Sequence, residues 1–221
     1  LTAFGQDHWV LTKNLALDYG LRLERQGITE TVRLAPRGGL AWTPFGNTRT
    51  VIRGGMGIFY DRVPLNVYSF SRFPEQIVTT YGPGGGVIDG PRRVLNITDQ
   101  AAATGAAFVS RSNKVGNFAP YTSTWTAEVE HPITEHLRVR VNYQASNSLG
   151  LITVTPSVVQ GQDALVLGGA GKSRYRQLEF TSKYTMTDGQ ELFFSYVRSR
   201  ALGNLNEFNN YLGNTPYPLV R

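Results

Sequence analysis

The stretch Leu15-Ala16-Leu17-Asp18-Tyr19-Gly20-Leu21-Arg22-Leu23-Glu24 decides the fold that this sequence predicts. Its odd positions are apolar or aromatic, whereas its even positions are small or charged. Successive side chains on a β-strand point to opposite faces, so this alternation predicts a strand with one apolar and one polar face. Counting this one, the pattern predicts strands at about 1–10, 14–26, 34–44, 49–62, 121–132, 136–148, 174–186 and 191–202.

The connections between the predicted strands alternate in length along the chain. Short turns are expected at 11–13, 45–48, 133–135 and 187–190, and two of them, 45–48 and 187–190, contain the Gly, Asn or Asp residues of hairpins. The other connections are longer, at about 27–33, 64–120, 149–173 and from 203 onward. Outer-membrane barrels carry short turns on one rim and long loops on the other. A soluble β-sandwich has no reason to keep its long loops at one end.

Strand length favours the same fold class. The predicted strands exceed the five or six residues usual in soluble sheets and suit a tilted bilayer crossing. We therefore expect an all-β chain that forms an antiparallel up-and-down transmembrane β-barrel in part, as about eight strands of a larger barrel. Aromatic residues near strand ends fit interfacial girdles, although ordinary core positions are the alternative: Trp9, Trp42, Tyr60, Tyr121 and Tyr175.

Composition excludes several other classes. No apolar run approaches the roughly 18 residues of a membrane helix. The chain has no cysteine, so it has neither disulfides nor a cysteine-based zinc site. The net charge of +6 comes from scattered Lys and Arg rather than from a cluster, so nucleic acid is not an expected partner.

Several ordered stretches resemble the barrel of TonB-dependent outer-membrane receptors, especially the Oar-like subgroup. The first strand pair carries Phe4-Gly5-Gln6-Asp7-His8-Trp9, Thr12-Lys13-Asn14-Leu15 and Gly20-Leu21-Arg22-Leu23-Glu24. The next hairpin carries Ala35-Pro36-Arg37-Gly38-Gly39-Leu40-Ala41-Trp42 and Ile58-Phe59-Tyr60-Asp61-Arg62. Further matches follow in the same order at Pro120-Tyr121, Trp125, Tyr143, Ser146, Ser195-Tyr196, Ser199 and Ala201.

The resemblance implies a barrel of about 22 strands filled by an N-terminal plug. The plug, the TonB-contacting segment and an aromatic C-terminal strand are not seen, so residues 1–221 are expected to be a fragment of the barrel domain. The implied location is the bacterial outer membrane. The implied partners are outer-membrane lipid, the TonB complex through a plug absent from this chain, and an unknown extracellular ligand.

The polar residues offer little chemistry beyond lining a lumen. Glu128 and Glu130 could form an acid/base pair, but lining a hydrated lumen beside Arg138 and Arg140 is the simpler interpretation. His131 and His136 flank one turn without a placed carboxylate, which makes a poor metal site. The segment 82–86 is Gly-rich but lacks the context of a phosphate loop. We expect no enzyme activity and no cofactor.

The long connection at about 64–120, predicted to be extracellular, is the expected ligand-binding segment. Loops of this length are usually functional or disordered, and aromatics with arginines could form a contact surface. The candidate ligand-binding residues are Tyr68, Phe70, Arg72, Phe73 and Tyr81. The sequence thus predicts a receptor or transporter segment; the alternatives are an outer-membrane adhesin and a soluble β-sandwich binding domain.

Overall fold

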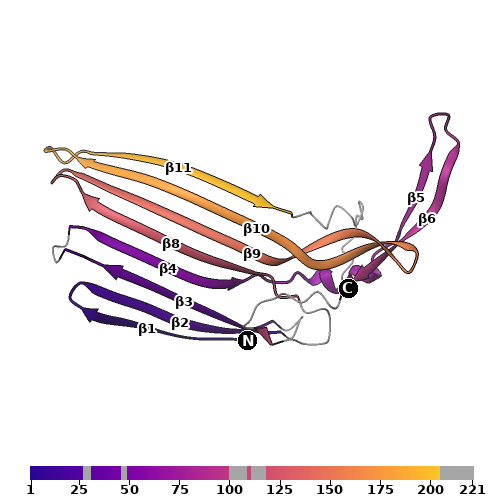
Figure 1. Cartoon of the computed structure of the whole chain (residues 1–221), viewed down its shortest axis with the longest axis horizontal. Coiled ribbons are helices and arrows are strands. Elements are labelled where there is room, and N and C mark those ends of the chain that lie inside the picture. The colour runs from indigo at the N-terminus through magenta and orange to yellow at the C-terminus, as the bar shows by residue number, and fades with distance from the viewer. Residues whose placement is uncertain (27–30, 46–48, 100–108, 111–117, 205–221) are drawn as a thin grey trace.

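The protein forms one long, curved sheet of strands lying side by side (Figure 1). The computed structural model describes residues 1–26, 31–45, 49–99, 109–110 and 118–204. The long strands are β1 (Thr2–Thr12), β2 (Leu15–Arg25), β3 (Val32–Trp42), β4 (Val51–Tyr60), β8 (Tyr121–Pro132), β9 (Leu137–Val159), β10 (Gln162–Thr185) and β11 (Glu191–Gly203).

These eight strands pair antiparallel in the order β1-β2-β3-β4-β8-β9-β10-β11. Among the described residues, β1 pairs with β2 alone and β11 with β10 alone, so the sheet is open at both edges. The predicted all-β, antiparallel and partial barrel wall is confirmed. No described helix is long and apolar enough to cross a membrane.

Register places the two kinds of side chain on opposite faces across the whole sheet. On β4 and β8, Met56 stands opposite Trp125, and Arg53 stands opposite Glu128. Because successive residues of a strand point to opposite faces, the pair Met56 and Trp125 lies on an apolar face and the pair Arg53 and Glu128 lies on a polar face. Every second residue of β2, β3, β9 and β10 continues the apolar face, including Leu17, Leu40, Val141, Leu178 and Phe180.

One exposed face of the sheet is apolar, whereas a water-soluble protein would cover such a face. Met56 is 70% exposed and Trp125 and Val129 are each 44% exposed. On the polar face, the side chains of Glu128 and Glu130 are only 18% and 19% exposed. A protein in water gains free energy by covering apolar surface, so this arrangement requires an apolar solvent on the Met56 face.

The long connection at 64–120 contains secondary structure that the sequence did not predict. It holds the short 3-10 helix η1 (Leu65–Arg72), the strands β5 (Gln76–Tyr81) and β6 (Val87–Thr98), and the two-residue β7 (Val109–Ser110), which pairs with β3. The sequence concealed β6 because Pro91 interrupts it, and a proline within a run argues against a strand.

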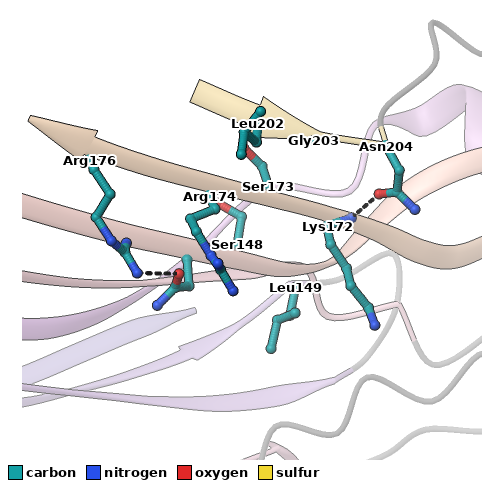
Figure 2. A pocket seen from close by; sticks show the side chains of 10 residues that line it. Ser148, Leu149, Lys172, Ser173, Arg174, Arg176, Leu202, Gly203 and Asn204 are labelled. Atoms are coloured by element: carbon teal, nitrogen blue, oxygen red, sulfur yellow. Dashed lines mark hydrogen bonds between the residues drawn. The ribbon is translucent and has the colours of Figure 1, made fainter. Parts of the chain in front are cut away.

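The prediction of a loop at 149–173 was wrong. Strands β9 and β10 continue through it and meet at the tight turn Gln160-Gly161, where both residues have positive φ. Their alternation fades here because residues such as Val154 and Leu167 are buried by other elements. Beside this extension, the backbone N–H of Lys172 donates to the Asn204 side-chain oxygen at 2.6 Å, just after β11 ends (Figure 2).

Strand β6 takes over as the neighbour of β10 beyond the end of β11. Residues 95–98 of β6 pair parallel with residues 164–167 of β10, and β5 pairs antiparallel with β6. The β5–β6 hairpin then projects away from the wall as an arm (Figure 1). This pairing covers a backbone edge of β10 that would otherwise be unbonded.

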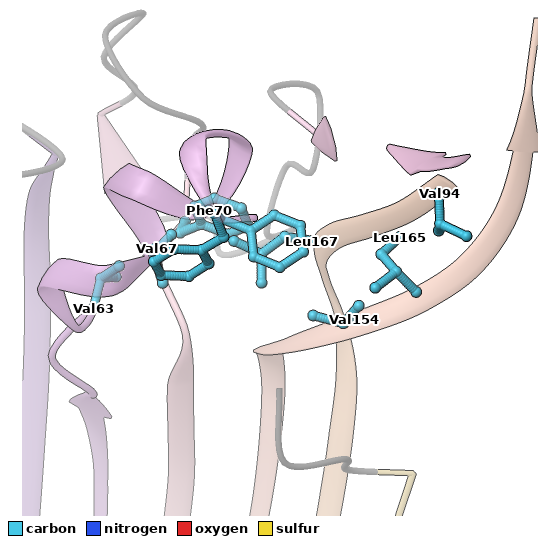
Figure 3. Packing of buried hydrophobic residues seen from close by; sticks show 9 residues of the cluster. Val63, Val67, Phe70, Val94, Val154, Leu165 and Leu167 are labelled. Carbon is cyan, nitrogen blue, oxygen red and sulfur yellow. The ribbon is translucent and has the colours of Figure 1, made fainter. Parts of the chain in front are cut away.

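The end of the sheet that carries the long connections is the long-connection rim. A hydrophobic core lies at this rim, where η1, β6, β9 and β10 meet (Figure 3). Buried Asn96 fastens β6 to the end of η1, because its amide donates to the Phe73 carbonyl at 3.1 Å. The cluster comprises Val63, Val67, Phe70, Phe73, Val94, Phe118, Val154, Leu165 and Leu167.

The two faces of β8 give a matched test of the solvent on each side. Ala127 lies on the apolar face and its neighbour Thr126 on the polar face. A lysine near the bilayer midplane costs about 2–4 kcal/mol on the lipid side, so Ala127→Lys should lower the free energy of unfolding by that amount. Thr126→Lys should change it by under about 1 kcal/mol, because the polar face is hydrated. Urea unfolding in lipid vesicles measures both, and equal losses would contradict the assignment.

Candidate functional site

An ion-pair network crosses the polar face near the end of the sheet that carries the short turns, which is the short-turn rim. Arg53 on β4 donates to Glu128 at 2.6 Å and to Glu130 at 3.0 Å on β8. Arg138 on β9 donates to Glu130 at 2.8 Å. The strand register brings these residues together, since Arg53 stands opposite Glu128 and Glu130 stands opposite Arg140. The prediction that Glu128 and Glu130 lie beside Arg138 and Arg140 is confirmed.

The network continues onto β10 through Arg140. Its guanidinium lies 3.3 Å from Glu179 and 4.0 Å from Glu128, and it donates to the Thr181 hydroxyl at 3.2 Å. Each carboxylate is thus matched by arginine, and neither glutamate of β8 is left as a free acid or base. This arrangement serves a hydrated, charged surface rather than acid/base catalysis.

Hydroxyl groups continue the polar face above the ion pairs. Thr122 and Ser148 are hydrogen-bonded at 2.8 Å, and Thr124 and Ser146 at 2.9 Å, across β8 and β9. Paired small hydroxyls present a wettable surface without fixed charge. On β8 and β9, the polar face therefore changes from ionic near the short turn to neutral further along the strands.

A buried arginine ties the strand ends together at the long-connection rim. Arg33 on β3 is fully buried and donates to the Asp61 carbonyl at 2.9 Å, to the Gln26 side-chain oxygen at 3.1 Å and to the Phe118 carbonyl at 3.3 Å. Its guanidinium carbon also lies 5.6 Å from the Tyr60 ring centroid. Arg33 therefore joins β2, β3, β4 and the segment that enters β8.

The structure separates the predicted ligand-binding residues into two groups. Phe70 and Phe73 lie in the hydrophobic core, with their rings 6.0 Å apart, so they fasten η1 to the wall. Arg72 at the end of η1 is exposed, and Tyr81 on the projecting arm is 63% exposed. Tyr68 lies on η1, and its side chain is outside the described set.

The histidines do not form a metal site in the described part of the chain, where no group of three potential ligands occurs. His131 hydrogen-bonds the Thr50 hydroxyl at 2.8 Å, and the rings of His136 and Tyr184 are 6.3 Å apart.

The profile of the outer membrane beta barrel domain matches residues 25–219, which is most of the chain. The chain belongs to the outer membrane β-barrel family. The apolar face of this barrel domain therefore faces lipid, its polar face lines the lumen, and its location is the bacterial outer membrane. Among curated proteins, no sequence matches it significantly.

Solved structures share the fold of the barrel domain at low sequence identity. The outer membrane transporter YddB from Escherichia coli is 15% identical over 90% of this chain and 24% of its own, with a TM-score of 0.60. The siderophore receptor PirA from Pseudomonas aeruginosa is 14% identical over 91% of this chain and 34% of its own, with a TM-score of 0.55. The FrpB iron transporter from Neisseria meningitidis is 10% identical over 92% of this chain and 26% of its own, with a TM-score of 0.50.

The barrel domain spans about a quarter to a third of the length of these structures. The resemblance to receptor barrels of the outer membrane is confirmed, since the family is an outer-membrane barrel and the similar structures are transporters and a receptor. Membership of the Oar-like subgroup stays a prediction.

Sequence reasoning did not find the hydrogen bonds of Arg33 to Asp61, Gln26 and Phe118, which together form the Arg33 clasp. It also did not find the hydrophobic core that holds η1. Arg33 falls on the polar face of an alternating strand, where arginine is expected, and nothing local indicates that it is buried. Its acceptors include Asp61 and Phe118, which lie 28 and 85 residues away in the chain. The one available signal was the pairing of β3 with β4, because extending its register brings Arg33 close to Tyr60 and Asp61.

Removing the Arg33 guanidinium should loosen this rim. Arg33→Met leaves the part-buried Asp61 carbonyl and the buried Phe118 carbonyl without this donor, which should lower the free energy of unfolding by roughly 1–3 kcal/mol. Arg37→Met, on the same strand and the same face but exposed, should change it by less than about 0.5 kcal/mol. Urea unfolding in vesicles compares them, and similar values for the two variants would refute the clasp.

Proposed function

We propose that this barrel domain is part of the wall of a larger TonB-dependent transporter that binds a ligand outside the cell and passes it through the lumen. The observation that carries the proposal is the continuous polar face, with paired ions and then hydroxyls, opposite a lipid-facing apolar face. The barrel performs no covalent chemistry; its work is selective binding and gated passage.

The two rims have different roles in this proposal. The short turns lie on the periplasmic side, as barrels of this kind arrange them, and the arm of β5 and β6 lies outside the cell. The ionic part of the lumen then faces a plug, which couples to the TonB complex in the resembling receptors.

The exposed members of the predicted ligand group form the outer contact surface in this proposal. Arg72 supplies a cation and Tyr81 an amphipathic ring, while Phe70 and Phe73 hold their base rigid. Siderophore reception and iron transport, named for two of the similar structures, support ferric siderophores as the first cargo to test.

Adhesion is the second candidate function, and the arm is the observation that favours it. Several of its apolar residues are exposed: Ile77, Val78, Val87 and Ile88. Such a projecting surface can contact another macromolecule as well as a small ligand. The soluble β-sandwich alternative has no support, because the described strands form one curved sheet without a second sheet on the apolar face.

Uptake of ferric siderophores by cells that carry the full-length protein tests the transport proposal. Uptake should fall to background when a protonophore collapses the proton motive force, and the combined Arg72→Ala and Tyr81→Ala variant should bind cargo at least about tenfold more weakly. Arg25→Ala is the matched control, because Arg25 is an exposed arginine at the end of β2, away from the arm. Uptake insensitive to the protonophore, or unchanged binding by the double variant, would count against the proposal. Arm-dependent attachment of cells to a surface without any uptake would favour adhesion.

A further inference from the structure

Four arginines interrupt the apolar face on its last two strands. They are Arg174 and Arg176 on β10 and Arg198 and Arg200 on β11, and together they form the outer arginine patch. Arg198 stands opposite Leu178, which lies on the apolar face. Strand alternation then places all four on that face, outside the barrel rather than in its lumen.

The outer arginine patch has no carboxylate partner among the described residues. On the polar face, Arg138 and Arg140 of β9 pair with glutamates, and Lys183 of β10 pairs with Glu191 of β11 at 2.7 Å. Arg176 donates only to backbone carbonyls and to the Asn147 side-chain oxygen at 3.3 Å, so its charge is not neutralised. The positive charge therefore needs a partner that this part of the chain does not supply.

The strand register brings these positive charges close together, so they repel one another. Arg176 stands directly opposite Arg200, with Arg198 two residues further along β11. Like charges directly opposite on paired strands repel and destabilise the sheet. Beside lipid the repulsion is weakly screened, because the local dielectric constant is lower than in water. An anion bound between these guanidiniums relieves it.

The depth of the patch matches a lipid headgroup. Arg176 follows the apolar residues Tyr184, Phe180 and Leu178 on one face of β10, counted from the short-turn rim. Eight residues of a tilted strand separate Tyr184 from Arg176, which is roughly 20 Å along the barrel axis. An apolar band is about 25 Å tall, so the patch lies where acyl chains end and headgroups begin.

A hollow continues from the patch toward the long-connection rim. It has a volume of about 590 Å³. Figure 2 shows Arg176, Arg174 and Lys172 extending from β10 on the same side as Leu149. Its lining thus combines cations with apolar surface, as a headgroup and the start of an acyl chain require.

We propose that the outer arginine patch binds the phosphates of a phosphorylated glycolipid in the outer leaflet of the outer membrane. This rests on the orientation in the proposed function, which places the long-connection rim outside the cell. Arginine forks bind phosphate oxygens in pairs, and four of them on neighbouring strands can hold one or two phosphates. Apolar Phe180 and Tyr196, which stand opposite each other below the patch, then contact the acyl chains.

The lipid, rather than a free phosphate, is the occupant because the site joins charge and apolar surface on a lipid-facing wall. Inorganic phosphate gains nothing from Leu149 or Leu178, and water hydrates it strongly. The acyl chains also hold the headgroup at high local concentration beside the patch.

The inference is tested by measuring how much lipid stays bound to the full-length protein after purification in detergent. The protein is incubated with lipid A, with lipid A stripped of both phosphates, or with lipid A plus excess inorganic phosphate, and bound lipid is counted by native mass spectrometry. The test variant combines Arg198→Gln and Arg200→Gln. The matched control is Arg25→Gln, since Arg25 is an exposed arginine at the same rim of β2, far from the patch.

The double variant should retain lipid A about tenfold or more weakly than the native protein, and the Arg25→Gln control should match the native protein. The combined Arg198→Lys and Arg200→Lys variant should retain an intermediate amount, because lysine keeps the charge but loses the paired contacts. Urea unfolding in the same detergent shows that each variant is folded.

Equal retention by the native protein and the double variant, or retention by neither, would overturn the inference. Equal retention of the dephosphorylated lipid would do the same, and displacement by inorganic phosphate would make the patch a free-anion site. Because lipid retention is measured without transport, loss of siderophore uptake bears on the proposed function alone.

Discussion

The hydrogen bonding of the backbone in a layer without water is the constraint on which this structure depends. Every N–H and C=O in the hydrocarbon region needs a partner within the protein, and long antiparallel strands supply one on each side. The strands β2, β3, β4, β8, β9 and β10 are each paired along both edges through the wall. Once backbone pairing fixes the register, alternation sends one set of side chains to lipid and the other to the lumen.

The distribution of charge follows from that separation. Facing the lumen, arginine and glutamate meet across strands, as Arg53 does with Glu128, so the charges there are neutralised in place. Facing lipid, the four arginines of the outer arginine patch have no such partner among the described residues and occur only where the apolar band ends. The same residue type thus indicates an ion-pair network on one face and a headgroup site on the other, and register alone distinguishes them.

The long-connection rim is built on different principles from the wall. There the strands leave the lipid, and burial by packing replaces solvation by acyl chains. Phe70 and Leu167 form a core that the wall itself lacks, and Asn96 and Arg33 satisfy backbone carbonyls that have left the sheet. The β5–β6 arm projects beyond this packed core (Figure 1).

The wall could be predicted from sequence because its signal is local. Each residue of β2 has a lipid or lumen environment fixed by parity, so the pattern in Leu15–Glu24 states the fold directly. The extension of β9 and β10 could not be predicted in this way, because residues such as Val154 belong to a hydrophobic core that also includes residues of η1 and β6, which lie far away in the chain. For the same reason, aromatic composition marked Phe70 and Phe73 as ligand contacts, whereas tertiary packing makes them core residues. Register, which places Arg200 opposite Arg176, also lies beyond local pattern.

The orientation of the two faces is most directly tested by fluorescence at adjacent positions of β10. The chain has no native cysteine, so Leu178→Cys and Gln177→Cys each give a single attachment site for a bimane dye. In vesicles of brominated lipid, the dye at Leu178 should be strongly quenched and the dye at Gln177 should not. Equal quenching at both positions, or quenching at Gln177 alone, would contradict a lipid-facing apolar surface and a hydrated lumen.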